Sequence, residues 1–146
     1  MLVDLIPRLE EPVIPELLGY AVAGEPELLR QAGLDYAGSD DLRLAGWEED
    51  GVVVGLVGYE ETEDGSLVIR HIAVLPENRG RGYARGMLLE LMLERNPRFV
   101  LAETGDELAA DFYRRLGFMV YSLGVNPAGV EQFRCVYEVE EAQDED

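Results

Sequence analysis

The feature that most restricts the fold of this chain is a change of hydrophobic period around an arginine- and glycine-rich loop. The apolar run HIAVLP begins at His71 and stops at Pro76, the loop ENRGRG follows, and an apolar pattern of helical spacing begins at Tyr83. A short β-branched run indicates a strand, whereas apolar residues that recur every three or four positions indicate an amphipathic helix. We therefore expect a strand, a short loop and a helix in direct succession.

This loop has the composition of a phosphate-binding site. A helix N-terminus presents about four unpaired backbone N–H groups and a partial positive charge, so it binds phosphate readily. Gly80 and Gly82 would let a phosphate approach the backbone, and Arg79 and Arg81 supply forked donors that match phosphate oxygens. The pattern favours a pyrophosphate cradle. The alternative is a surface loop whose arginines serve only solubility.

Two other phosphate motifs fit less well. A dinucleotide fingerprint needs GxGxxG, but Gly80, Gly82 and Gly86 are one residue out of that spacing, and we expect no parallel βαβ unit around them. A Walker loop needs GxxxxGK[ST], and all 12 basic residues of this chain are arginines. Neither motif is predicted.

Composition and charge narrow the class of protein. The chain has 146 residues, 47% of them apolar, which suits one domain with its own core. Its net charge is -18, yet residues 70–99 hold six arginines against three acidic residues. Nucleic-acid binding needs a broad basic face and is disfavoured, whereas a compact anion site is favoured. With no apolar run of ~18 residues and no signal-peptide pattern, we expect a cytoplasmic protein without a membrane partner.

The pattern of elements predicts a mixed α/β sheet, mostly antiparallel and flanked by helices. Residues 12–24 stay ambiguous, and a helix over 25–32 should end at Gly33. The helix over 82–95 should be covered on most sides. One domain should span residues 1–140, followed by an acidic tail over 141–146. The expected strands are 2–7, 42–47, 52–60, 67–74, 99–103, 118–123 and 132–140, and the remaining helix is 106–116, closed by Gly117.

Two blocks of this sequence resemble the GNAT superfamily, the GCN5-related N-acetyltransferases. The family's coenzyme A motif reads [Q/R]-x-x-G-x-[G/A], and here RGRGYA follows a strand that ends in IAVLPE. The second block is AETGDELAADFYRRLGF, in which a Phe-Tyr pair precedes an apolar-Gly-Phe turn. The resemblance is strong over residues 67–118, extends to 42–140, and implies the GNAT fold with acetyl-CoA as co-substrate and no metal.

The resemblance also implies where the coenzyme binds. The pyrophosphate would lie on the loop, and the pantetheine arm would pair with the strand backbone as an added strand. Asp106 stands where the family often has Asn, and it suits a helix N-cap better than a coenzyme contact. The implied coenzyme contacts are Ile72, Ala73, Val74, Arg79, Gly80, Arg81, Gly82, Tyr83, Ala84, Asp106 and Tyr113.

Three residues are catalytic candidates. Tyr113 stands where the family often places the general acid that protonates the leaving thiolate. The attacking amine needs a base or a water chain, and His71 and Glu103 are the candidates among the side chains. Each has a structural alternative: Tyr113 as a packing residue, His71 as a structural histidine, and Glu103 paired with Arg70 or another arginine. The single cysteine, Cys135, suits a buried apolar role.

The predicted function is the transfer of an acetyl group from acetyl-CoA to a primary amine by direct attack in a ternary complex. The alternative is a non-catalytic acyl-CoA-binding or sensing domain of the same fold, and a third class is an assembly domain that binds no coenzyme. The acidic surface would attract a cationic amine. The sequence leaves open the acceptor (a small amine, an amino sugar, or a protein N-terminus or lysine), the length of the acyl group, and a homodimer through the C-terminal strands.

Overall fold

The structure is a computed structural model, and it describes residues 2–139. The predicted acidic tail, 141–146, lies outside the described residues. The chain divides into two compact units, one of Met1–Glu60 with Arg70–Arg95 and the other of Glu61–Ile69 with Asn96–Asp146. Each unit is considered by itself below, and the prediction of a single domain stays a prediction.

The first unit combines strands with three α-helices. β1 pairs antiparallel with β2, and β2 pairs antiparallel with β3 through the tight turn at Asp50 and Gly51, which both have positive φ. β4 follows β3 in the order of the sheet. In chain order the elements are β1 (Leu2–Asp4), the 3-10 turn η1 (Ile6–Arg8), α1 (Val13–Ala21), α2 (Pro26–Gly38), β2 (Leu42–Glu49), β3 (Val52–Glu61), β4 (Leu67–Val74), η2 (Pro76–Asn78) and α3 (Tyr83–Arg95).

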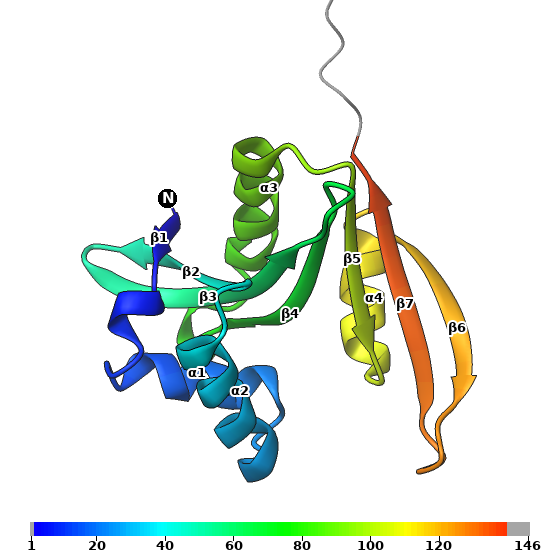
Figure 1. The fold of residues 1–146 in the computed structure, drawn as a ribbon, viewed down its shortest axis with the longest axis horizontal. Coiled ribbons are helices and arrows are strands. Elements are labelled where there is room, and N and C mark those ends of the chain that lie inside the picture. Colours follow the sequence, from blue (N-terminus) through cyan, green and yellow to red (C-terminus); the bar gives the residue numbers. More distant parts are fainter. Residues whose placement is uncertain (1, 140–146) are drawn as a thin grey trace, which may run out of the picture. The chain divides into compact units, whose positions relative to one another are not determined.

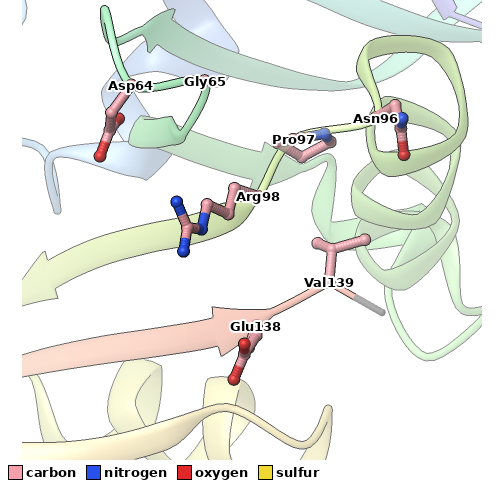
Figure 2. A pocket seen from close by; sticks show the side chains of 7 residues that line it. All are labelled: Asp64, Gly65, Asn96, Pro97, Arg98, Glu138 and Val139. Carbon is pink, nitrogen blue, oxygen red and sulfur yellow. The ribbon is translucent and has the colours of Figure 1, made fainter. Parts of the chain in front are cut away.

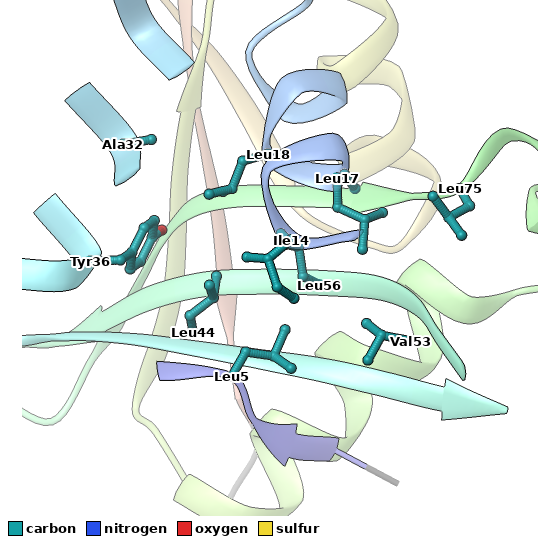
Figure 3. Packing of buried hydrophobic residues seen from close by; sticks show 11 residues of the cluster. Leu5, Ile14, Leu17, Leu18, Ala32, Tyr36, Leu44, Val53, Leu56 and Leu75 are labelled. Carbon is teal, nitrogen blue, oxygen red and sulfur yellow. The ribbon is translucent and has the colours of Figure 1, made fainter. Parts of the chain in front are cut away.

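The main core of this unit lies between its strands and the helices α1 and α2 (Figure 3). Leucines and isoleucine from these helices meet Leu44 and Leu56 of the strands, and all of them are buried. Most of the ambiguous segment 12–24 is thus a helix, Val13–Ala21, because one face of this helix completes the core. Its buried residues are Ile14, Leu17 and Leu18.

Two helix predictions need correction. α2 does not end at Gly33 but continues to Gly38, because Tyr36, one turn after Ala32, is buried in the core and holds the second half of the helix. α3 is also less covered than expected, since Leu93 on its far side is 84% exposed. Its buried side is Met87, Leu88 and Leu91.

The second unit contains the first part of β4 together with β5 (Phe99–Thr104), α4 (Glu107–Arg115), β6 (Met119–Val125) and β7 (Glu131–Glu138). β5 pairs antiparallel with β7, and β7 with β6. The predicted helix cap is confirmed, because Gly117 has a φ of 99° just after α4. Cys135 is fully buried, as its apolar role required.

One topological prediction was wrong. β4 and β5 pair in parallel from Leu67–Val100 to Ile69–Ala102, so the Arg-Gly loop does lie within a β4–α3–β5 parallel unit. The error has a physical reason: strands on either side of a helix can pair in parallel, and sequence order alone does not show which neighbours pair.

The pairings build a seven-stranded sheet of order β1-β2-β3-β4-β5-β7-β6, and β4 takes part in both units (Figure 1). Only the β4–β5 pairing is identified as parallel. The predicted fold class, a mostly antiparallel mixed α/β sheet with helices on its faces, is confirmed. Among the helices of residues 2–139, none is long and apolar enough to cross a bilayer.

Candidate active site

The Arg-Gly loop adopts the backbone conformation that its glycines permit. Gly80 and Gly82 have φ of 79° and 82°, in the left-handed region that other residues enter at a cost. A Cβ atom at either position would meet nothing within 4 Å, so their backbone faces open space. The carbonyl of Gly82 accepts the first helical hydrogen bond, from Gly86 at 2.9 Å. The loop therefore ends as the N-cap of α3.

The backbone N–H groups of residues 80–85 form the most unusual feature of this loop. None of these consecutive groups has a hydrogen-bond partner within the part of the chain that the structure describes. Successive free N–H groups in a loop of this kind can bind one anion and then form what is called a nest, and the helix dipole adds to the attraction. The sequence prediction of an anion cradle rested on composition, and the backbone geometry now supports it.

Arg79 is held in place beside this nest. Its Nε donates to the carbonyl of Val74 at 3.0 Å, and its guanidinium carbon lies 5.1 Å from the ring centre of Tyr20 on α1. These contacts leave the two terminal nitrogens of the guanidinium without a partner within residues 2–139. Tyr20 was missed by the sequence reasoning, because nothing in its local pattern shows that α1 passes over the loop.

The other two arginines of the loop region are exposed and carry no ion pair to any described residue, namely Arg81 and Arg85. Tyr83, at the start of α3, packs on Trp47, with the ring centres 6.3 Å apart. Trp47 also lies against Gly86, at 3.6 Å from its Cβ position. The indole N–H of Trp47 donates to the carboxylate of Glu49 at 3.0 Å, so its ring lies between α3 and the end of β2 in its contacts.

The second half of β4 offers a free backbone edge. Pairing with β5 ends at Ile69, so residues 70–74 have no β5 partner among the described residues. Leu75 donates to Val54 of β3, and Ala73's carbonyl lies 3.1 Å from the Cβ position of Gly55 on β3. Along a strand, the N–H and C=O groups of successive residues point alternately to its two sides. Those of Ile72 and Val74 therefore point away from β3. Of the three predicted pantetheine contacts, these two have groups directed away from β3.

His71 lies on β4 and meets a residue that sequence reasoning did not identify. Its Nδ1 is 2.7 Å from the hydroxyl of Tyr36, and the two rings make an edge-to-face contact with centres 5.5 Å apart. Burial lowers the pKa of His71, and the charge of Arg70 lowers it further against the opposing effect of Asp35. The imidazole is therefore neutral at pH 7.

In the second unit, Tyr113 of α4 is only 4% exposed and packs between Phe112 and Phe118. Burial raises the pKa of Tyr113, so its hydroxyl keeps its proton at neutral pH. The hydroxyl makes no hydrogen bond within residues 2–139, and the oxygen is not sealed from solvent. Tyr113 is thus a packing residue whose hydroxyl stays available to donate.

The side chains of the other two candidates in this unit, Asp106 and Glu103, both interact with other residues of the unit. The side chain of Asp106 accepts from the N–H of Leu108 at 2.9 Å, so its predicted role as N-cap of α4 is confirmed. Glu103 forms an ion pair with Arg134 of β7, at 2.7 Å and 3.0 Å, and both side chains are at least half exposed. Arg70, which had been considered as its partner, pairs with Glu60 instead.

The predicted residues thus fall into two groups. The first unit holds His71, the β4 edge and the loop, and the second holds Glu103, Asp106 and Tyr113. A pocket of about 770 Å³ also occurs in the second unit, but it contains none of these residues (Figure 2). It is lined by Asp64, Gly65, Asn96, Pro97, Arg98, Glu138 and Val139.

Comparison with known families shows which family the chain belongs to. The family described as "Acetyltransferase (GNAT) domain" matches residues 41–120, which is more than half of the chain and includes the nest and Tyr113. The chain belongs to the GNAT acetyltransferase family. It is therefore an acyl-CoA-dependent N-acyltransferase in general class.

Solved GNAT structures share the fold over nearly the whole length of this chain. A GNAT-family protein from Desulfovibrio desulfuricans is 22% identical, with a TM-score of 0.76 over 96% of this chain and 99% of its own. A GNAT acetyltransferase from Elizabethkingia anophelis, solved with acetyl-CoA, is 14% identical, with a TM-score of 0.73 over 95% and 97%. An aminoglycoside 6'-N-acetyltransferase in complex with coenzyme A is 11% identical, with a TM-score of 0.70 over 99% of both chains.

Proposed function

We propose that this GNAT protein transfers an acetyl group from acetyl-CoA to a primary amine by direct attack within a ternary complex. The observation that carries the proposal is the row of N–H groups at residues 80–85, which have no partner within residues 2–139 and lie next to Arg79 and Arg81. A pyrophosphate offers the charge and the several acceptor oxygens that this row requires.

The residues of the first unit would hold the coenzyme. The nest and the terminal nitrogens of Arg79 would bind the pyrophosphate, and the contact with Tyr20 keeps that guanidinium oriented. The backbone edge at Ile72 and the N–H of Val74 would pair with the pantetheine amides as with a neighbouring strand, while the Val74 carbonyl accepts from Arg79. Ala73 would contribute through its position between them, because its carbonyl faces β3.

The chemistry needs two proton movements. Acetyl-CoA supplies an acyl thioester, whose carbon forms a bond with the amine nitrogen while its bond to sulfur breaks. An N–H of the free β4 edge would stabilise the charge that develops on the carbonyl oxygen. The hydroxyl of Tyr113 would give its proton to the leaving sulfur. The proton lost by the amine would pass to His71, to Glu103 or to a water chain.

The acceptor is proposed to be a cationic amine. The net charge of -18 attracts cations and repels nucleic acids. A panel of polyamines, amino sugars and peptides with free N-termini, assayed for release of coenzyme A thiol, would identify the class. Neutral and anionic amines of similar size are the controls, and a preference for them would contradict this proposal.

The first test is thermal unfolding with and without acetyl-CoA. Ligand at about 100 times its dissociation constant stabilises a fold by about 2.7 kcal/mol, which is on the order of 5–10 °C for a chain of this size. The shift should shrink in Arg79→Ala/Arg81→Ala. The matched control is Arg30→Ala/Arg43→Ala, which removes the same charge from exposed positions on α2 and β2.

The outcomes separate the possible functions. A shift that is lost in the loop variant and kept in the control supports the coenzyme site. A shift without turnover of any amine would favour a coenzyme-sensing domain. No shift at millimolar acetyl-CoA would reject the proposed function.

A further inference from the structure

The ring of Tyr36 packs against β3 of the first unit at a position where the strand has a glycine, Gly58. A Cβ atom on Gly58 of β3 would lie 1.7 Å from the Tyr36 hydroxyl oxygen, so only glycine leaves room for the ring. Tyr36, which is labelled in Figure 3, is 1% exposed. Its hydroxyl contacts Nδ1 of His71 at 2.7 Å. The pair is thus built into the interface between α2 and the strands.

The proton positions follow from the partners that are present. His71 Nδ1 is the one hydrogen-bond partner of the Tyr36 hydroxyl within residues 2–139. A buried hydroxyl that keeps its proton needs an acceptor, and the Nδ1 lone pair is the acceptor within reach. The neutral imidazole then carries its hydrogen on Nε2, which has no partner in the described chain and is not sealed from solvent.

The charged neighbours do not change this assignment. Asp35 and Arg70 act on His71 through their charge, and Glu60 acts on Tyr36 in the same way. The Asp35 carboxylate accepts from Gln31 at 2.8 Å, and Glu60 pairs with Arg70. None of these three groups makes a hydrogen bond to the imidazole.

We propose that Tyr36 is a positioning residue that donates to Nδ1 and holds His71 as the Nε2–H tautomer, so that His71 offers the acceptor molecule a hydrogen-bond donor and takes no proton at Nε2. The role toward the acceptor rests on the proposed function. This role requires an amine substrate that has an oxygen atom near its amine, so that the oxygen can accept the hydrogen bond from Nε2–H. It also assigns the amine's proton to Glu103 or to a water chain.

The tautomer can be measured without any enzymatic activity. His71 is the only histidine, so uniformly ¹⁵N-labelled protein gives a single pair of imidazole nitrogen signals. Long-range proton–nitrogen correlation at pH 7.5 should show a protonated Nε2 and an unprotonated Nδ1. In Tyr36→Phe the Nδ1 signal should move toward that of a nitrogen that receives no hydrogen bond. A protonated Nδ1 in the native protein, or an unmoved Nδ1 signal in the variant, would overturn the proposal.

Kinetics distinguish a donor from a base. His71→Gln keeps an N–H near the Nε2 position, whereas His71→Leu keeps none. A donor role predicts that Gln retains activity within about tenfold with an unchanged pH–rate profile, and that Leu loses at least a further tenfold, mostly in KM. Equal losses in both variants, with the acid limb of the profile removed, would establish His71 as the base and overturn the donor role. If no amine is acetylated, the nitrogen signals still decide the tautomer.

A second inference concerns the edge of the sheet in the second unit. β6 is an edge strand of seven residues, and no charged residue occurs between residues 116 and 130. The opposite edge, β1, has three residues and ends in Asp4. Edge strands are usually protected by short length or by charge, and β1 has both protections whereas β6 has neither. The exposed large apolar side chains of β6 are Met119, Tyr121, Leu123 and Val125.

We infer that β6 pairs antiparallel with β6 of a second copy of this chain. Two copies that each carry a charge of -18 repel one another, so a contact between them is most favourable where neither presents an acidic residue. An antiparallel pair of identical strands closes about a two-fold axis and places no like charges opposite one another here.

Sedimentation velocity of the full chain tests this inference. The native protein should sediment as a dimer, and Leu123→Glu/Val125→Glu should sediment as a monomer with native circular dichroism. The control is Leu89→Glu/Leu93→Glu, which adds the same charge to exposed positions of α3 and should remain a dimer. A monomeric native protein, or a dimer that survives the β6 substitutions, would reject this interface.

Discussion

The hydroxyl of Tyr36 occupies the space that a side chain at Gly58 would need, because a Cβ atom there would lie 1.7 Å from that oxygen. Gly58→Ala should therefore destabilise the fold by about 1–3 kcal/mol, as overpacking of a core does. Urea unfolding measures the loss. Gly33→Ala is the control: it lies inside α2 with nothing within 4 Å, so it should stabilise by about 0.5–1 kcal/mol. A neutral Gly58→Ala would mean that Tyr36 lies elsewhere.

The role of the loop glycines in coenzyme binding can be distinguished by mutation from the role of a glycine in an ordinary turn. Gly80→Ala forces a residue with a Cβ into left-handed backbone, which should cost about 1–2 kcal/mol and weaken acetyl-CoA binding by changing the direction of the N–H groups. Gly51 has the same φ, 79°, in the β2–β3 turn. Gly51→Ala should cost similar stability but leave coenzyme affinity unchanged. Equal effects of both variants on calorimetric binding would contradict the nest.

Asp106 combines a confirmed cap with a predicted coenzyme contact. Asp106→Ala should lower the free energy of unfolding by about 1 kcal/mol, because the N–H of Leu108 loses its acceptor. Asp106→Asn keeps an acceptor oxygen and should keep most of that stability. Stability curves of the three proteins check the cap. If Asn lost as much as Ala, the carboxylate charge rather than the cap would be responsible.

Tyr113→Phe should lower kcat by about 10²–10⁴ if its hydroxyl protonates the leaving sulfur, with little change in coenzyme affinity. Tyr137 is the matched position, since its ring also packs on Phe118, and Tyr137→Phe should leave kcat unchanged. Burial raises the pKa of Tyr113 in the folded state above its ordinary 10.0. The contribution of this difference to the free energy of unfolding is fully present below pH 10 and is lost as pH rises through the raised folded pKa. The alkaline loss of stability should be smaller in Tyr113→Phe.

The pH dependence of stability should show His71 directly. Burial lowers its pKa in the folded state from the ordinary 6.5, so the unfolded chain takes up the proton first as pH falls. The contribution is fully present above pH 6.5 and is lost as pH falls through the lowered folded pKa, by at most about 1.4 kcal/mol per pH unit. Urea unfolding of native protein and His71→Gln between pH 7.5 and 5 checks this. Parallel curves would show that burial does not affect the imidazole.

Local patterns were sufficient for much of the fold. The strand over residues 67–74 has the predicted bounds, and the Arg-Gly loop and the cap at Asp106 lie as expected. Each depends on interactions between residues a few positions apart, which a single sequence displays. Tyr36 was missed because Gly33 looked like a helix end, and the spacing of Ala32 and Tyr36 was the signal that could have extended the helix.

The sequence by itself determined the order of the elements and the composition of the anion loop, because hydrophobic period, glycine and capping residues act locally. Tertiary structure alone decided that β4 and β5 pair in parallel and that the guanidinium of Arg79 lies against the ring of Tyr20. It also decided that Gly58 leaves room for the Tyr36 hydroxyl beside His71. These relationships join residues far apart in the chain. Their energies depend on which surfaces meet, and nothing in the neighbourhood of either residue reveals its partner.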